Sequence, residues 1–504
     1  MSSLDKQSNL CPKHPKILEI NTWPWLYYLS HKYKQQITLN NIPAEFFDLH
    51  FIHFDVIWLM GVWERSVEGR NIAIQHPGLQ EEYKQALKVL SNEDVVGSPY
   101  SIYDYQVDTK LGGEQGLIVF RKELKKRNKL LLVDYVPNHL SVDHKWTLQK
   151  PEIFMTGTQE DLNKTPDNYF VRNNRIFAYG KDPNFPPWTD TVQINAFSSE
   201  ARESAIKILL YIASKSDGVR CDMAMLFLND VFRRTWGVKA GRTPEKEFWK
   251  IIIPKIKEKY PNFLFIAEVY WNMEWELQQL GFDFCYDKRL YERLAHGNSQ
   301  SILAHIRADL DFQSRLVRFI ENHDEERVIS LFGRERSMAA AIIALTLPGA
   351  RMIYEGQVLG HKIKLPVQLG RTPFEENDEI LVQFYQSLLA VVPDKKMTKH
   401  GIWSLNTVIP ISNNDNSHLN LISYQWKSNE IFQLIVVNFS AYSSKGHVKM
   451  DKIDYNQNGE KIIFEDVLND KIYTYNKNDI EKHGLYVELE PWKGHIFDIK
   501  RKLV

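Results

Sequence analysis

The chain has 504 residues, which is too long for one ordinary domain but fits a barrel of about 250 residues with insertions and one appended domain. Lysine plus arginine and aspartate plus glutamate each total 63, and the basic residues form no stripe, so the composition argues against a nucleic-acid partner. Cys11, Cys221 and Cys285 lie far apart without a Cys-x-x-Cys pair, which argues against a disulfide framework and a zinc site.

The chain shows neither a targeting segment nor a membrane span. Met1 to Lys16 is polar and charged, and the best apolar run, Met338 to Leu347, stops at Pro348 before it reaches spanning length. Because the three cysteines also suit a reducing compartment, we expect a cytoplasmic protein that makes no membrane contact.

Between about Pro15 and Pro393, short β-rich apolar runs alternate with longer stretches of helical period. The expected strands are Ile17–Ile20, Val56–Met60, Leu130–Asp134, Gly218–Asp222, Leu264–Glu268, Asp283–Tyr286, Val317–Glu321 and Met352–Tyr354. The expected helices include Gly116–Arg127, Ser199–Ser214, Glu245–Lys259 and Met338–Leu347. Eight such β/α units predict a closed (β/α)₈ (TIM) barrel.

Two further segments flank or interrupt this barrel. The connection after His139 stays polar, Pro-rich and Asn-rich to about Ala196, a length typical of a functional loop or a subdomain. From about Lys399, alternating strands separated by turn residues predict an antiparallel β-sandwich. We therefore expect a catalytic barrel at 1–140 and 197–398, an inserted subdomain after the third strand at 141–196, and a C-terminal β-domain at 399–504.

Several expected strands end in polar or ionisable residues, where a buried parallel strand would otherwise stay apolar. Barrel enzymes build their active sites at these carboxyl ends. The segments concerned are Asp134–His139, Gly218–Asp222, Leu264–Glu268 and Val317–Asp324. The pattern predicts that Asp222, Glu268 and Asp324 converge on one mouth of the barrel.

These segments resemble the α-amylase family. Its four diagnostic regions are matched, in order, by Asp134-x-x-x-Asn138-His139, Gly218-x-Arg220-x-Asp222, the apolar strand ending at Glu268, and Asn322-His323-Asp324. Tyr100 with Asp104-Tyr105 is similar to the family's tyrosine-bearing loop, and Gln193-Ile194-Asn195 to the motif that closes its inserted subdomain. Each residue alone has a plainer interpretation, such as an ion pair, a core histidine or a packing aromatic, but their joint order favours the catalytic one.

The resemblance implies a retaining glycosidase that acts on α-glucosidic bonds. It implies Asp222 as nucleophile, Glu268 as general acid/base and Asp324 as third carboxylate, with Tyr100, His139, Arg220 and His323 as substrate-binding residues. Elementary chemistry fits these roles: Arg220 lies two residues before Asp222, on the same side of an extended strand, and favours its ionised form. Partial desolvation after an apolar strand would raise the pKa of Glu268, as an acid needs.

The chain also departs from the family. Met223-Ala224-Met225-Leu226 stands where many α-amylases carry a Lys-His pair that contacts the sugar beyond the cleaved bond, and Ser101 stands where an aspartate is common. Leu365 to Arg371 is similar to the Pro- and Gln-bearing segment of oligosaccharide-acting members. The missing Lys-His pair weighs against endo-hydrolysis of starch, and Ser101 implies different hydrogen bonding in its loop.

The resemblance further implies a structural calcium ion at Asn138, for which no oxygen set stands out by spacing, while the chemistry itself requires no cofactor. Four functions stay open: hydrolysis of an α-glucan, oligosaccharide or disaccharide; glycosyl transfer or isomerisation of the trehalose or sucrose type; a catalytically inactive carbohydrate-binding barrel; and a phosphate-dependent barrel enzyme. The last two are disfavoured, because all three acidic positions and both histidines are present and no glycine-rich phosphate loop follows the last strands.

Overall fold

The structure is a computed structural model that describes residues 11–393, 397, 401–428, 431–450 and 461–500. Most of the polar N-terminal segment and the expected domain boundary at 398/399 therefore lie outside the described residues. Contacts group the chain into two compact units. The first comprises 1–11, 17–286 and 363–374, and the second comprises 12–16, 287–362 and 375–504.

Eight parallel strands form a closed barrel in the order β1-β14-β13-β12-β11-β10-β5-β2. They are β1 (Lys16–Asn21), β2 (Val56–Met60), β5 (Leu130–Tyr135), β10 (Gly218–Cys221), β11 (Leu264–Ala267), β12 (Phe284–Tyr286), β13 (Leu316–Arg318) and β14 (Ala350–Tyr354). Such strands are apolar throughout because both faces are covered, as in β2, where all five residues are buried. The predicted barrel and its eight strands are confirmed.

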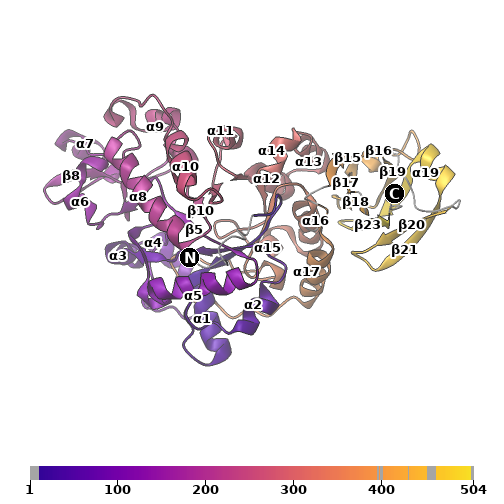
Figure 1. The fold of residues 1–504 in the computed structure, drawn as a ribbon, viewed down its shortest axis with the longest axis horizontal. Coiled ribbons are helices and arrows are strands. Elements are labelled where there is room, and N and C mark those ends of the chain that lie inside the picture. Colours follow the sequence, from indigo (N-terminus) through magenta and orange to yellow (C-terminus); the bar gives the residue numbers. More distant parts are fainter. Residues whose placement is uncertain (1–10, 394–396, 398–400, 429–430, 451–460, 501–504) are drawn as a thin grey trace. The chain divides into compact units, whose positions relative to one another are not determined.

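The first unit carries the inserted segment and the first crossover helices (Figure 1). Its helices are α1 (Thr22–Tyr33), α2 (Ala44–His50), α3 (Val67–Gln75), α4 (Pro77–Ala86), α5 (Gly113–Lys126), α8 (Ser199–Lys215), α9 (Asn229–Trp236), α10 (Phe248–Lys259) and α11 (Glu274–Gln279). A two-stranded ribbon of β3 (Trp63–Arg65) and β4 (Ile102–Val107) follows the second barrel strand. Helix α8 packs against both α5 and α10 on the outside of β5 and β10 (Figure 1).

The insertion after β5 is ordered rather than irregular. It comprises β6 (His139–Ser141), α6 (Trp146–Gln149), α7 (Gln159–Lys164), β7 (Tyr169–Arg172), β8 (Arg175–Ala178) and β9 (Thr191–Gln193). Strand β6 pairs with β9, so the end of the insertion returns to its beginning: His139 lies opposite Gln193.

The second unit contains the last barrel strands and the C-terminal β-domain. Its helices are α12 (Lys288–His296), α13 (Ser299–Ile306), α14 (Leu310–Ser314), α15 (Val328–Phe332), α16 (Arg334–Thr346), α17 (Glu379–Val391) and α19 (Lys477–His483). The β-domain pairs one sheet of β15 (Ile402–Leu405), β17 (Leu421–Lys427), β18 (Ile431–Asn438), β23 (Gly494–Lys500), β20 (Lys461–Asp466) and β21 (Lys471–Asn476) with a second of β16 (Thr407–Ile409), β19 (Ser444–Lys449) and β22 (Leu485–Leu489). The antiparallel C-terminal domain that the sequence predicted is confirmed.

Buried polar groups tie this β-domain to α16 and α17. The Trp426 indole donates to the Thr346 carbonyl at 2.7 Å, and the hydroxyls of Tyr424 and Thr346 lie 2.7 Å apart. The Gln433 amide donates to the Val391 carbonyl at 3.0 Å. Because these groups would be costly to leave unpaired, the β-domain and these helices stabilise each other.

A fully buried arginine, Arg318, organises the centre of the second unit. Its guanidinium pairs with Asp287 and donates to Gln313 and to the Pro348 carbonyl, and Asp287 also contacts His305 at 2.8 Å. Although burial opposes the charge of Asp287, Arg318 and His305 lower its pKa to about 2. Burial lowers the pKa of Arg318 itself.

Within the described residues, no helix is both long and apolar enough to cross a membrane.

Candidate active site

A second fully buried arginine, Arg220, stands at the centre of the candidate site in the first unit. Its Nη1 donates to Asp222 Oδ1 at 2.7 Å, and its Nη2 lies 2.9 Å from Glu268 Oε2. Asp134 Oδ1 is 3.8 Å from Nη1. Burial would lower the pKa of Arg220, but its neighbours, Glu268 foremost, raise it well above the usual value. One permanent cation thus binds the two carboxylates that the sequence singled out.

Aromatic rings enclose this guanidinium. It lies 5.4 Å from the ring centres of both Trp58 and Tyr100 and 5.6 Å from that of Tyr286, and its Nε donates to the Tyr286 hydroxyl at 3.3 Å. Such cation–π contacts strengthen when water is excluded. The rings therefore fix Arg220, and with it the two carboxylates, in one orientation.

Asp222 reaches this position because β10 runs tightly between its neighbours. A Cβ on Gly218 would lie 2.6 Å from the Cβ of Leu264, so the close approach of β10 and β11 requires glycine. The Asp222 N–H donates to the Tyr135 carbonyl at 2.9 Å, which extends the pairing of β10 with β5. Asp222 directly follows the last residue of β10 and is buried, at 6% exposure.

Glu268 follows β11 and is also held from the backbone. Its N–H donates to the Cys221 carbonyl at 3.0 Å, the Met223 N–H donates to Oε2 at 2.7 Å, and the Tyr270 hydroxyl donates to Oε1 at 3.0 Å. We expected apolar surroundings for this carboxyl group. It is indeed buried, at 3% exposure, but a cation and two donors surround it.

The Cys221 and Cys285 thiols are buried in the barrel strands β10 and β12, which lie on either side of β11. Burial raises the pKa of the Cys221 thiol well above its usual range, so this thiol is unreactive in the folded barrel.

His139 is buried in the turn where the insertion begins. Burial lowers its pKa to about 3, so the imidazole is neutral at ordinary pH and can both donate and accept hydrogen bonds. Its ring lies 5.1 Å from that of Trp188, a residue of the insertion. Tyr100 is half-buried, and its backbone is hydrogen-bonded to His139. The structure thus brings Tyr100, His139, Arg220, Asp222 and Glu268 together within the first unit.

The expected calcium ligand, Asn138, is interlocked with Gln193. The Gln193 amide donates to Asn138 Oδ1 at 2.9 Å and to its carbonyl at 3.0 Å, and the Asn138 amide lies 3.3 Å from Gln193 Oε1. The Asn138 side chain thus contacts Gln193 through both its oxygen and its nitrogen, and the expected calcium ligand stays a prediction. Across the part of the chain that the structure describes, no three His, Cys, Asp or Glu side chains gather as a metal site.

Asp324 belongs to the second unit, in the loop that follows β13. Asn322 Oδ1 accepts from the N–H groups of Asp324 and Glu325 at 2.9 and 3.0 Å, which folds this loop. The His323 side chain is fully buried and lies 3.1 Å from Asp324 Oδ2, whereas the Asp324 side chain is 43% exposed. The loop therefore exposes the Asp324 carboxylate to solvent, in contact with the buried His323 side chain.

Just before this loop, Glu321 is bound by Arg327 at 2.8 Å and by the Val328 N–H at 2.6 Å. Both partners belong to the same unit, so this buried carboxylate supports the loop and its role is structural.

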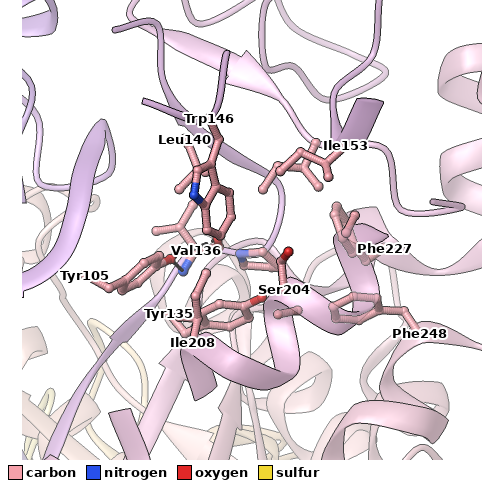
Figure 2. A pocket seen from close by; sticks show the side chains of 14 residues that line it. Tyr105, Tyr135, Val136, Leu140, Trp146, Ile153, Ser204, Ile208, Phe227 and Phe248 are labelled. Carbon is pink, nitrogen blue, oxygen red and sulfur yellow. Dashed lines mark hydrogen bonds between the residues drawn. The ribbon is translucent and has the colours of Figure 1, made fainter. Parts of the chain in front are cut away.

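A recess behind the insertion is distinct from these residues. Figure 2 shows Tyr105, Tyr135, Trp146, Phe227 and Phe248 around it, with Ser204 of α8 at its edge. The Tyr105 hydroxyl accepts from the Val136 N–H at 3.0 Å, so its polar atom is engaged. The recess holds none of the predicted site residues, and we interpret it as a packing gap.

Comparison with known proteins agrees with this picture. The model of the α-amylase catalytic domain matches residues 211–404, a range that includes Asp222, Glu268 and Asp324. Alpha-amylase MalA of Haloarcula japonica is 25% identical over 358 residues, which cover 68% of this chain and 48% of that protein. The chain thus spans about half the length of this curated relative.

Solved structures show the same fold over nearly the whole chain. The noncanonic maltogenic alpha-amylase AmyB of Thermotoga neapolitana has a TM-score of 0.67 at 21% identity and covers 98% of this chain and 100% of its own. The alpha-amylase of Geobacillus thermoleovorans, complexed with acarbose, has a TM-score of 0.65 at 16% identity, covering 98% and 99% of the two chains. The comparisons confirm the resemblance to the α-amylase family of glycosidases that the four motifs predicted, and they single out no one specificity.

Proposed function

We propose that this protein is a retaining glycoside hydrolase that cleaves α-glucosidic bonds of oligosaccharides or disaccharides. The observation that carries the proposal is that Arg220 binds Asp222 and Glu268 through its two terminal nitrogens, at 2.7 and 2.9 Å. Carboxylates that share one guanidinium are held near each other, which supports a retaining pair, whose carboxyl groups lie roughly 5 to 5.5 Å apart.

In the first step, Asp222 attacks the anomeric carbon. Since Oδ1 accepts from Arg220, we assign the attack to Oδ2. The buried cation keeps the carboxylate ionised without competing for the sugar. The bond to the leaving oxygen breaks as the glycosyl ester forms.

Glu268 protonates the leaving oxygen and then deprotonates water. Met223 and Arg220 hold Oε2, so we assign proton transfer to Oε1, the oxygen that the Tyr270 hydroxyl contacts. Tyr270 is then a positioning residue, because it acts on the substrate only through this oxygen.

The other predicted residues act on the bound sugar. Neutral His139 would hydrogen-bond a sugar hydroxyl, and Tyr100 would offer its ring face to the reacting glucose. Asp324, with His323, would oppose the positive charge of the transition state. The assignment of Asp324 rests on the family resemblance and on its exposed carboxylate.

The first test separates the two carboxylates. Glu268→Gln should reduce turnover of maltooligosaccharides about 10²- to 10⁴-fold and reduce the first-turnover release of fluoride from α-maltosyl fluoride much less, because fluoride leaves without a proton. An equal loss in that first-turnover release would remove Glu268 from the acid role.

Asp222→Ala tests the nucleophile. A fluorosugar that traps the glycosyl ester should add one glycosyl mass to the wild-type protein and none to the variant. Persistent labelling of Asp222→Ala would place the nucleophile elsewhere. Acarbose, which is bound in the Geobacillus structure, is a suitable competitor for specific labelling.

Transfer of the glycosyl group to another sugar is the second candidate function, because hydrolysis and transfer proceed through the same covalent glycosyl ester. A panel of maltooligosaccharides, trehalose, sucrose and isomaltose, with and without phosphate, would distinguish free glucose or maltose from longer or rearranged products. The buried thiols of Cys221 and Cys285 suit a cytoplasmic enzyme. A calcium requirement would appear as activity or melting temperature lost on dialysis against a chelator and regained with calcium.

A further inference from the structure

Another buried arginine, Arg65, lies near the candidate site and uses only part of its guanidinium. It is the last residue of β3 and is 9% exposed. Its Nη1 donates to the Gly97 carbonyl at 2.6 Å and to the Val367 carbonyl at 3.2 Å. Among the described residues, neither Nε nor Nη2 has a hydrogen-bond partner. Two buried donors of a cation thus remain for another group, which is costly unless something binds them.

These two nitrogens form one edge of the guanidinium. Their N–H groups point the same way, which is the geometry that binds two oxygens of a phosphate or carboxylate. A Cβ on Gly61 would lie 2.8 Å from Nη2, so this edge borders the residue that follows β2. The carboxyl ends of barrel strands are where substrates bind.

The ring of Trp23 lies against the same guanidinium. Arg65 Cζ is 5.2 Å from the ring centre, and the buried indole Nε1 has no hydrogen-bond partner in the part of the chain that the structure describes. Lys110 is exposed, and its ammonium lies 5.8 Å from the same ring centre. All of these groups can donate hydrogen bonds and none can accept one. A cluster of donors alone favours a ligand that only accepts, which is an anion.

Trp23 is also the second residue of α1, and no side chain caps the start of this helix. Asn21 precedes the helix without accepting a capping hydrogen bond, and the first turn contains no acidic residue. The N–H groups and the dipole of a helix start favour a negative charge there. The Thr22 hydroxyl donates to the Met60 carbonyl at 2.8 Å, which joins the helix start to the end of β2. The helix start and the free edge of Arg65 therefore lie at the same barrel end.

Arg65 shares two neighbours with the catalytic cluster. Tyr100 and Asp134 both lie beside Arg220, and both also raise the pKa of Arg65. Asp108 acts in the same direction, but burial outweighs all three and lowers the pKa of Arg65 to about 9. The charge of this arginine is thus less well compensated than that of Arg220.

The order of the strands shows on which side of the cluster this site lies. The barrel runs β11-β10-β5-β2-β1, so Trp23, which follows β1, lies beyond Asp222 and away from Glu268. In the proposed function Glu268 protonates the leaving oxygen. An anion at Trp23 would therefore belong to the sugar that Asp222 binds and not to the leaving group.

We propose that Arg65, Trp23 and Lys110, with the start of α1, bind a phosphate group carried by the donor sugar. The inference rests on the proposed function and narrows the substrate to a phosphorylated α-glucoside. A phosphate dianion suits two cations, and two of its oxygens accept from the Nε and Nη2 edge of Arg65. Because these nitrogens are buried, the half-buried Trp23 ring turns aside as the phosphate enters.

Calorimetric titration of the full chain measures this site without turnover. Glucose 6-phosphate, inorganic phosphate, glucuronate and glucose are compared at equal ionic strength. We expect glucose 6-phosphate to bind about tenfold more tightly than each of the others, because it alone supplies both the sugar and the dianion. Equal affinity for inorganic phosphate would overturn the assignment to a donor sugar, and equal affinity for glucuronate would overturn the assignment to phosphate.

Three variants test the residues. Arg65→Lys keeps a cation but loses the paired edge, and it should weaken glucose 6-phosphate binding about tenfold or more. Trp23→Phe removes only the indole N–H and should weaken it about fivefold. Lys110→Ala, at an exposed side chain, should weaken it about threefold. Lys32→Ala is the matched control, because this exposed lysine lies 5.8 Å from the Tyr33 ring at the other end of α1.

The last two variants keep the inference testable if Arg65→Lys does not fold. Unchanged affinity in both Trp23→Phe and Lys110→Ala, or an equal loss in Lys32→Ala, would overturn the phosphate site.

Turnover separates this inference from the proposed function. The wild-type protein should hydrolyse p-nitrophenyl α-glucoside 6-phosphate with a kcat/KM about tenfold or more above that of p-nitrophenyl α-glucoside, and Arg65→Lys should remove most of this preference. Equal turnover of the two donors would overturn the phosphate site alone. Turnover of neither donor, with glucose 6-phosphate still bound, would contradict the proposed function instead.

Discussion

Arg220 and Arg318 are both fully buried guanidinium groups on barrel strands, and both pair with carboxylates, yet they serve different ends. Arg318 is bound by Asp287, by Gln313 and by the Pro348 carbonyl, and Asp287 is shared with His305. Arg220 instead binds two carboxylates, Asp222 and Glu268, which, like Asp287, each follow the last residue of a barrel strand.

The pKa values of the two arginines are shifted in opposite directions. Burial lowers the pKa of Arg318, while Glu268 and the other neighbours of Arg220 raise its pKa against burial. A buried ion pair is thus not evidence of function by itself. Two carboxylates around one buried cation at the strand ends indicate instead a site whose negative charge can act on a substrate.

The largest effect expected from this comparison is on turnover. Asp222→Asn should reduce kcat by on the order of 10⁴-fold or more, because the nucleophile is lost while Arg220 keeps Glu268 as partner. Initial rates on maltooligosaccharides check this, and a melting curve near that of wild type serves as control. Retained turnover would put Arg220 in the same structural class as Arg318.

The converse variant is Asp287→Asn. It leaves Arg318 buried without a charged partner, so the free energy of unfolding should fall by about 3 to 5 kcal/mol. The turnover of the molecules that remain folded should stay near wild type. Denaturant unfolding and an active-site titration measure the two quantities. A variant of wild-type stability would show that Gln313 and Pro348 suffice to hold Arg318.

His139, which lies in the same unit as Arg220, allows a test through the pH dependence of stability. Its folded pKa of about 3 lies below the unfolded value near 6.5, so the unfolded chain takes up its proton first and stability falls as pH drops from about 6.5 toward 3. His139→Gln should flatten this slope by up to about 1.4 kcal/mol per pH unit. The shape of the rate profile between pH 5 and 8 should not change, because a neutral histidine does not titrate there. A shifted rate profile would contradict a neutral His139.

The smallest expected effect concerns Tyr270. Tyr270→Phe removes one hydrogen bond to Glu268 Oε1, worth about 1 kcal/mol, and should slow turnover of natural donors about fivefold and slow the first-turnover release of fluoride from α-maltosyl fluoride less. Comparing kcat on natural donors with the rate of that fluoride release checks this. An equal effect on both would mean that Tyr270 contacts the sugar directly.

The barrel could be predicted from the sequence because strands covered on both faces are continuous apolar runs, whose polar ends then stand out. Asp222 and Glu268 were visible for this reason. The Arg220–Asp222 pair could be predicted because two residues along a strand share a side. The links from Arg220 to Glu268 and Tyr286, and from Arg318 to Asp287, depend on strand register across the barrel, and no local pattern reports that.

Gln193 was identified only as part of a motif, and its partner was missed. Its amide interlocks with that of Asn138, 55 residues earlier, because β6 and β9 pair when the insertion closes. Side-chain amides can pair with many groups, so composition and spacing could not select this one.

The thiol of Cys221, which directly precedes Asp222, can report how often β10 separates from its neighbouring strands. Because this thiol is buried and Cys11 is half-exposed, a reagent should label Cys11 in a burst and Cys221 in a slow phase. The labelling rate at Cys221 itself then measures local opening of the barrel beside Asp222.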